Sequence, residues 1–201
     1  KAIIACSFAP DRYRYSQVFR GGSLLLRSIR WSSQLFGYKS RPPDPQLVGA
    51  RWRDMWMERL EHDTPQIVAA LKHQANDEYW KSRAIDYKPI KAAFYAVSGW
   101  ADGSYVGSVS ESLGQLKAPH KGLIGPWGHR FPHLAVPWPA IDFLGESLRW
   151  FDRWMRGGAP RDEPALVAWM GEAVPAQAWY PHAPGRWVVE REWPSARIRV
   201  R

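Results

Sequence analysis

Two side chains that together can carry out acid–base chemistry, Asp102 and His129, each follow a short apolar run of the sequence. A neutral imidazole can take a proton from a hydroxyl nucleophile and return it to a leaving group, provided that its tautomer is fixed. A buried carboxylate that accepts the other ring N–H fixes the tautomer and stabilises the imidazolium that forms. The pair therefore predicts two of the three groups of an acyl-transfer triad.

The elements that must position this pair are two strands with a helix between them. The apolar runs Ala92–Val97 and Gly122–Ile124 are followed by Gly99 and Gly125 respectively. Runs of this length that end at Gly or Pro fit strands buried on both faces of a parallel sheet. Catalytic and ligand-binding side chains lie at the carboxyl ends of such strands, because the loops there converge on a crevice. The acid and the histidine are therefore predicted to meet at one edge of a sheet.

The third group of the triad, the nucleophile, is missing from the sequence. The acid precedes the histidine, which is the chain order of α/β-hydrolases, and the separation accommodates one crossover helix and one strand. However, no G-x-S-x-G occurs in the 201 residues. The chain also begins with Lys1 and enters a strand-like segment, Lys1–Ser7, at once, which predicts a start in the middle of a fold.

The residues around the pair resemble a known family. The segments G-W-A-D-G (Gly99–Gly103) and G-L-I-G-P-W-G-H (Gly122–His129) closely resemble the paired motifs of the cocaine-esterase/X-prolyl-dipeptidyl-peptidase (CocE/NonD) serine hydrolases. The resemblance implies an α/β-hydrolase core with an inserted helical cap and a C-terminal jelly-roll domain. It further implies that Asp102 is the triad acid and His129 the triad base. The serine and the oxyanion-hole donors would lie upstream of Lys1, so the fragment alone is expected to be inactive.

The resemblance also suggests which residues contact the substrate, a small ester or peptide-like molecule. Residues that flank the pair are expected to line the acyl pocket: Trp100, Ser104, Tyr105 and Trp127. The segment Pro10–Tyr13 resembles an acidic segment of the family, but Arg14 stands where relatives continue with acidic residues. This difference weakens the case for a substrate with a free amine, and Asp11 could equally cap its own turn.

The domain organisation follows from the order of helix and strand patterns. Residues 1–22 and 87–160 are predicted to form a partial α/β-hydrolase core, residues 23–86 a helical cap, and residues 161–201 the start of a β-sandwich. The predicted strands of this last segment are Pro164–Met170 and Gly185–Glu190, with a further half-buried strand at Ile198 and Val200.

Helical periodicity predicts four main helices. Three of them fall in the predicted cap, and they are Leu24–Phe36 with Ser23 as N-cap, Gln46–Glu61, and a helix from Thr64 to about Lys72. The fourth runs from Pro139 to Met155 and ends at Gly157 in the left-handed conformation. Its stripe of Leu144, Leu148, Phe151 and Met155 is expected to pack on the sheet. In the cap, Asp77 is expected to cap a helix and Trp80 to pack in the interior.

The composition of the chain argues for or against other classes of function, such as binding to nucleic acid or to membranes. The net charge of +9 and the pI near 9.9 raise the question of nucleic acid or anionic membranes. The Arg residues, however, alternate with Trp, Met and Leu at helical spacing, which is typical of solvated helix faces. The single cysteine, Cys6, excludes an internal disulfide, and no apolar run approaches the roughly 18–20 residues of a membrane span. Neither nucleic acid nor membrane is therefore an expected partner; a cytoplasmic location is favoured, and the oligomeric state stays open.

Metal binding and a non-catalytic role are the remaining alternatives. His133 follows His129 by four residues, a spacing that suggests a metal site on a helix. Pro132 lies between them and excludes a regular helix, so neither metal nor cofactor is expected. A binding or structural protein, in which the acid and the histidine are satisfied core residues, is the alternative to a hydrolase. The sequence upstream of Lys1 discriminates between these two functions.

Overall fold

The computed structural model describes residues 1–16, 18–158 and 162–198. It divides into two compact units. The core unit consists of residues 1–10 and 85–201, and the inserted unit consists of residues 11–84. The bounds of the inserted unit differ from those of the predicted cap, residues 23–86, and the assignment of a cap stays a prediction. Among the described residues, no helix is both long enough and apolar enough to cross a membrane.

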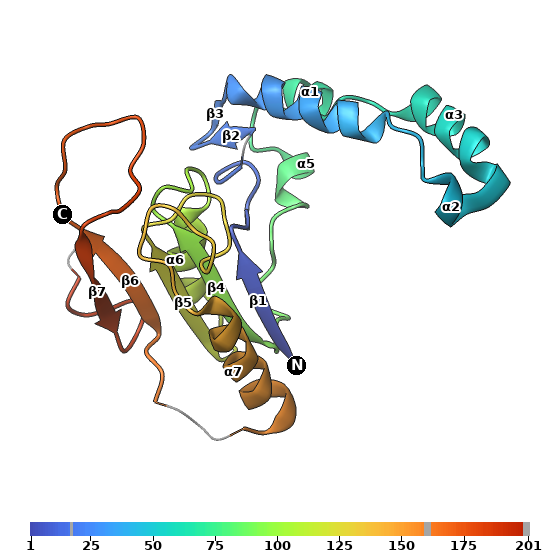
Figure 1. Cartoon of the computed structure of the whole chain (residues 1–201). Coiled ribbons are helices and arrows are strands. Elements are labelled where there is room, and N and C mark those ends of the chain that lie inside the picture. The colour runs from blue at the N-terminus through green and yellow to red at the C-terminus, as the bar shows by residue number, and fades with distance from the viewer. Residues whose placement is uncertain (17, 159–161, 199–201) are drawn as a thin grey trace. The chain divides into compact units, whose positions relative to one another are not determined.

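The core unit is built on a five-stranded, mostly parallel sheet (Figure 1). Its elements are β1 (Ala2–Cys6), β4 (Ala93–Gly99), α6 (Val106–Gln115), β5 (His120–Gly125), α7 (Phe143–Arg156), β6 (Leu166–Gly171) and β7 (Gly185–Glu190). The strand order is β1-β4-β5-β6-β7, and the first four strands run parallel to one another, while β7 is antiparallel to β6. The strands predicted around Asp102 and His129 are confirmed as β4 and β5, with α6 as the crossover helix between them.

The interior strand β4 is buried along its whole length, because helices cover both faces of the sheet. Successive side chains of a strand point to opposite faces. Phe94 and Ala96 accordingly pack in one apolar cluster with Val109 of α6. Tyr95 on the other face packs in a second cluster with Trp150 of α7. The two helices lie on opposite sides of the sheet (Figure 1), which explains why the strands read as apolar runs without alternation.

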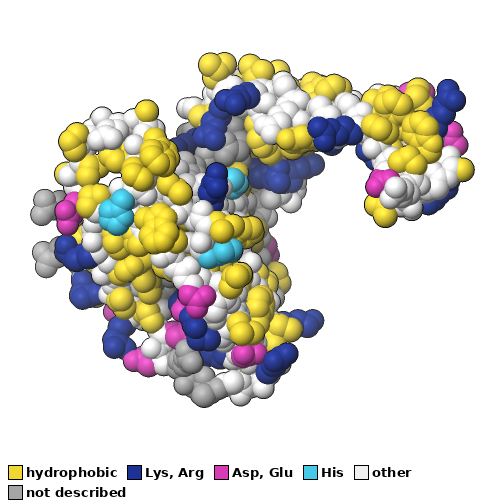
Figure 2. Space-filling model, viewed as in Figure 1, with side chains coloured by type: hydrophobic (Ala, Val, Ile, Leu, Met, Phe, Trp, Pro, Cys, Tyr) yellow, Lys and Arg dark blue, Asp and Glu magenta, His cyan; other side chains and the backbone are white. Residues whose placement is uncertain are grey.

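The face that α7 presents to the sheet differs from the prediction. Leu144 and Leu148 are 64% and 62% exposed, so the expected Leu144, Leu148, Phe151, Met155 stripe does not form the buried face. Hydrophobic side chains are visible at the surface over this helix (Figure 2). The helix instead buries Phe143 and Trp150. Two apolar stripes, offset by one residue, compete for the sheet, and the one with the larger aromatic area is buried. The predicted end at Gly157 in the left-handed conformation is confirmed, with φ at 73°.

The predicted strands after residue 161 form, but they extend the core sheet instead of starting a separate sandwich. The strand β6 pairs in parallel with β5 through Gly122 and Leu166, and β7 pairs with β6 along its whole length. Ile198 lies outside any strand, and Val200 lies outside the described residues. The apolar side chain of Leu166 is buried in the cluster beneath α6, which is why this segment joins the core.

The inserted unit consists of a short hairpin and a series of helices. Its elements are β2 (Phe19–Arg20), β3 (Ser23–Leu24), α1 (Arg27–Lys39), α2 (Pro45–Val48), the 3₁₀ turn η1 (Gly49–Arg51), α3 (Trp52–His62), α4 (Gln66–Lys72) and α5 (Glu78–Lys81). Its interior is formed by Val18, Phe19, Ala70 and Trp80. The succession of helices after the hairpin agrees with the predicted pattern, and the packing of Trp80 is confirmed.

Three local predictions for the inserted unit have definite outcomes. The first helix begins at Arg27, because Ser23 pairs with Arg20 in the hairpin and does not act as an N-cap. The predicted helix from Gln46 is interrupted at Gly49, whose φ of 63° is incompatible with a continuous helix. Asp77 caps α5 as predicted, since its side chain accepts a hydrogen bond from the Tyr79 backbone N–H.

Candidate active site

The acid and the histidine lie at the carboxyl ends of two adjacent parallel strands. Asp102 follows β4 by three residues and His129 follows β5 by four residues. The strands pair in register up to Gly99 and Gly125, so both loops leave the same edge of the sheet. The sequence prediction that these two side chains meet at one edge is therefore supported by the topology.

The two side chains are in direct contact. His129 Nδ1 lies 2.8 Å from Asp102 Oδ1. A carboxylate only accepts hydrogen bonds, so Nδ1 is the nitrogen that carries the proton and Nε2 is the one that can accept a proton. Asp102 is only 5% exposed, whereas the His129 side chain is 67% exposed. The arrangement places a buried acid behind an imidazole that faces outward, as a general base requires.

Backbone hydrogen bonds hold the two loops together. The Trp100 N–H donates to the Gly125 carbonyl at 2.9 Å, and the Ala101 N–H donates to the Trp127 carbonyl at 3.0 Å. The Asp102 N–H then turns back to the Gly99 carbonyl at 3.0 Å. The acid loop is thus fastened directly to the histidine loop, so the geometry of the pair does not depend on the two side chains alone.

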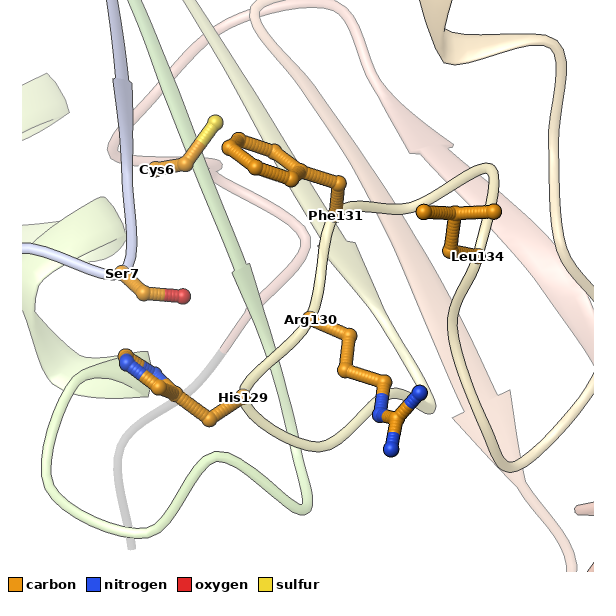
Figure 3. Close-up of a pocket in the computed structure, with 6 residues that line it drawn as sticks. All are labelled: Cys6, Ser7, His129, Arg130, Phe131 and Leu134. Atoms are coloured by element: carbon orange, nitrogen blue, oxygen red, sulfur yellow. The ribbon is translucent and has the colours of Figure 1, made fainter.

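A small pocket opens beside the histidine (Figure 3). Its volume is about 350 Å³, and it is lined by Cys6, Ser7, His129, Arg130, Phe131 and Leu134. Cys6 and Phe131 lie together at one end, while the Ser7 hydroxyl is directed into the space beside His129 (Figure 3). Burial raises the pKa of the Cys6 thiol to about 11. At neutral pH this thiol is protonated, which argues against Cys6 as a nucleophile.

The four residues expected to line the acyl pocket occupy different environments. Trp127 is buried between the sheet and α7, and its indole N–H donates to the Pro139 carbonyl at 2.7 Å. Trp100 donates to the Trp169 carbonyl of β6 at 2.6 Å, so its ring is held toward that strand. Ser104 is buried, and its hydroxyl has no hydrogen-bond partner among the described residues.

Tyr105 is the one of the four that touches the acid–histidine pair. Its ring stacks on the ring of His129, with centroids 5.3 Å apart and an interplanar angle of 27°. Stacking of this kind limits the rotation of the imidazole about its own axis. Tyr105 therefore helps to hold the histidine ring, in addition to the hydrogen bond that the ring donates to Asp102.

Sequence reasoning missed most of the residues that line the pocket. Phe131 and Leu134 belong to the proline-rich loop that follows His129, and their position directly after the histidine was an available signal. Cys6 and Ser7 come from the end of β1, far away in the chain. Their signal was that Lys1–Ser7 is a third apolar run, and parallel strands end at a common edge. Among the described residues, no group of three or more His, Cys, Asp or Glu is placed to hold a metal ion.

Gly99 allows the close approach of the two loops, and its substitution supplies a test of this packing. A Cβ at Gly99 would lie 2.1 Å from the Trp127 carbonyl oxygen, which is part of the histidine loop. We expect Gly99→Ala to lower the free energy of unfolding by about 3 kcal/mol, at the upper end of overpacking effects, and to lower activity as well. The measurement is urea denaturation of the purified protein.

Gly114 of α6 is the matched control for this substitution. A Cβ there meets no atom within 4 Å, and alanine favours a helix over glycine by about 0.5–1 kcal/mol. Gly114→Ala should therefore be neutral or stabilising. Equal stability of the two variants would show that the loops can separate without cost.

A parallel sheet covered by helices on both faces, with an acid and a histidine at neighbouring strand ends, is the architecture of the α/β-hydrolase class. The chain belongs to the X-Pro dipeptidyl-peptidase (S15) family, whose model matches residues 1–130. This confirms the resemblance seen in the sequence motifs. Two crystal structures of a CocE/NonD family hydrolase from Staphylococcus aureus have the same fold over 98% of this chain, with TM-scores of 0.68 and 0.67 at 19% and 20% identity.

Curated relatives are also similar over part of the chain. Proteins named as candidate serine esterases in Mycobacterium bovis and Mycobacterium tuberculosis are each 30% identical over 100 residues, or 47% of this chain. The aligned region spans only 15% of each mycobacterial protein. The chain spans 31% and 30% of the two S. aureus structures. It is therefore comparable with a minor part of these relatives' length.

Proposed function

We propose that the protein is a serine hydrolase of acyl esters or peptide-like amides, in which Asp102 and His129 are two members of a Ser-His-Asp triad. The observation that carries the proposal is the 2.8 Å contact between the buried acid and the outward-facing histidine. The nucleophile serine would come from a segment outside these 201 residues, since the sequence contains no G-x-S-x-G. Membership of the X-Pro dipeptidyl-peptidase family supports the same chemistry.

In this mechanism His129 moves protons at Nε2. The serine hydroxyl transfers its proton to Nε2 while its oxygen attacks the carbonyl carbon of the substrate. When the tetrahedral intermediate collapses, the imidazolium returns that proton to the departing alcohol or amine. A water molecule then repeats both steps on the acyl-enzyme and releases the acid. Asp102 holds the Nδ1–H throughout and stabilises the positive charge on the ring.

The pocket beside His129 supports a substrate with a modest apolar group. Phe131, Leu134 and Cys6 give this space an apolar lining, and its volume of about 350 Å³ lies within the usual range of small-molecule sites. One carboxylate oxygen of Asp11 accepts hydrogen bonds from the backbone N–H groups of Tyr13 and Arg14, as a turn cap does, and Asp11 belongs to the inserted unit, so it supplies no support for a free-amine substrate. An acyl ester is accordingly the substrate class to test first.

The experiment is covalent labelling with a fluorophosphonate, followed by peptide mass spectrometry. An activated serine displaces fluoride and forms an oxygen–phosphorus bond, so only a working nucleophile is labelled. For the protein expressed from its complete gene, we expect one labelled serine, located outside residues 1–201. Heat-denatured protein is the control and should not react. A label on Ser7 would contradict the assignment of the nucleophile, and no label at all would favour a non-catalytic protein.

A further inference from the structure

A third strand end reaches the acid–histidine pair, and it carries a serine. Ser7 directly follows β1, the neighbour of β4 in the sheet. Its backbone N–H donates to the Val97 carbonyl at 2.9 Å, so the residue is anchored to β4 by the last hydrogen bond of the ladder. Its hydroxyl donates to Asp102 Oδ2, the carboxylate oxygen that His129 does not use. Three adjacent strands thus each place one side chain in this cluster.

The backbone of Ser7 adopts a conformation that side-chain-bearing residues rarely take. Its φ is 49°, in the left-handed region, and it is the only non-glycine residue with positive φ among the described residues. Such a conformation costs free energy and persists only where the surrounding structure holds it. Here it turns the chain sharply at the end of β1, and the hydroxyl is directed into the space beside His129 (Figure 3).

The carboxylate of Asp102 needs two partners to have one orientation. With a single hydrogen bond to His129, the carboxylate could turn about its Cβ–Cγ bond and still keep that contact. A second donor at Oδ2, from a separate strand, fixes the plane of the group. Asp102 is buried, so a carboxylate oxygen without a hydrogen-bond donor would lose its contacts with water on folding and gain no bond in exchange, which costs free energy. Ser7 supplies that donor.

We propose that Ser7 is a positioning residue of the active site, which orients Asp102 and through it the Nδ1–H of His129. This inference rests on the proposed function. It assigns Ser7 no contact with the reacting atoms: its proton is used on the carboxylate and is not offered to His129. The residue would act mainly on the rate of the chemical step, because its hydroxyl is bound to the acid even though the residue lines the pocket.

Two substitutions at Ser7 separate the hydroxyl from the backbone conformation. Ser7→Gly removes the hydroxyl and also removes the conformational cost of a φ of 49°, whereas Ser7→Ala removes the hydroxyl and keeps that cost. Both variants are made in the protein expressed from its complete gene and assayed with p-nitrophenyl acetate. We expect both to lose kcat by roughly 10- to 100-fold, the range for a hydrogen bond to a charged group, with KM changed less than about twofold. Ser7→Ala should lower the Tm more than Ser7→Gly, because both leave Asp102 Oδ2 without its donor but only glycine relieves the cost of the positive φ.

A matched control and a spectroscopic measurement sharpen the test. Ser98, near the end of β4, is likewise buried, but its hydroxyl has no hydrogen-bond partner among the described residues. Ser98→Ala should keep kcat. In the proton NMR spectrum, the Nδ1–H of His129 should lie far downfield in the parent protein. It should shift upfield or broaden in Ser7→Gly, a change that a purely structural role would not cause.

The outcomes distinguish this inference from the proposed function. Full kcat in Ser7→Gly, with the His129 resonance unchanged, would overturn the role of Ser7 and leave the triad intact. A different outcome is that the label maps to Ser7 in the parent protein and is lost in Ser7 variants that still fold. That result would make Ser7 the nucleophile and would overturn both its positioning role and the proposed triad. Failure of both variants to fold would assign the residue to folding, which also contradicts the proposal.

Discussion

Replacement of His129 by alanine is expected to abolish fluorophosphonate labelling and ester hydrolysis. His129 contacts the buried acid, faces the pocket, and carries the ring nitrogen that can accept a proton. Without it, nothing takes the proton from the serine hydroxyl, and the hydroxyl is a weak nucleophile at its own pKa. Loss of a triad histidine costs roughly a million-fold in kcat. Both signals should fall to the background of the uncatalysed reaction, as measured by in-gel fluorescence and by a p-nitrophenyl ester assay.

A second histidine on the same strand supplies the control for this experiment. His120 begins β5, at the end of the strand opposite to His129, and its Nδ1 lies 2.8 Å from the Ala118 carbonyl oxygen. His120→Ala should keep both labelling and hydrolysis. Unchanged labelling in His129→Ala would show that His129 is not the base of the mechanism, because the proposal gives the serine no other group that could take its proton.

The Asp102→Asn substitution is expected to leave the fold intact and to lower kcat by about 10⁴-fold. The side chains have nearly the same shape, so the buried site between β4 and β5 can still be filled. The difference lies in the hydrogen bond: an amide NH₂ directed at His129 favours the tautomer that carries its proton on Nε2. That tautomer cannot accept the serine proton. The measurements are kcat and the circular dichroism spectrum of the purified protein.

A carboxylate on α7 tests whether this loss is specific to Asp102. Asp152 is paired with Arg156 at the surface, with 3.4 Å between Oδ1 and the guanidinium nitrogen. Surface pairs of this kind contribute little, so Asp152→Asn should keep both kcat and stability within error. Full activity in Asp102→Asn would show that a different carboxylate serves as the triad acid.

The sequence by itself was sufficient for the local features of the core. The segments that became β1, β4 and β5 read as buried strands because each is short, apolar and followed closely by a strand-ending residue or turn. The acid and the histidine were predictable because parallel strands in one sheet end at a common edge. The end of α7 at Gly157 was predictable for the same local reason, since glycine takes the left-handed conformation freely.

Choices between equally apolar alternatives needed the tertiary structure. The helix α7 carries two stripes of suitable spacing, and only packing against the sheet decided that Trp150 is buried and Leu148 exposed. In the same way β6 reads as a strand, but its partner β5 cannot be inferred from its own residues, so its place in the core sheet was missed. A strand's periodicity specifies which faces it has, not which strand lies beside it.

What the sequence determined about this protein is therefore the pair of side chains that can move a proton and the strand ends that carry them. What only the tertiary structure decided is which other side chains contact that pair. Ser7 lies 95 positions from Asp102 in the chain, yet its hydroxyl reaches the same carboxylate. The physical reason is that hydrogen bonds across neighbouring strands depend on how the sheet is assembled, whereas turns and strand ends are encoded within a few residues.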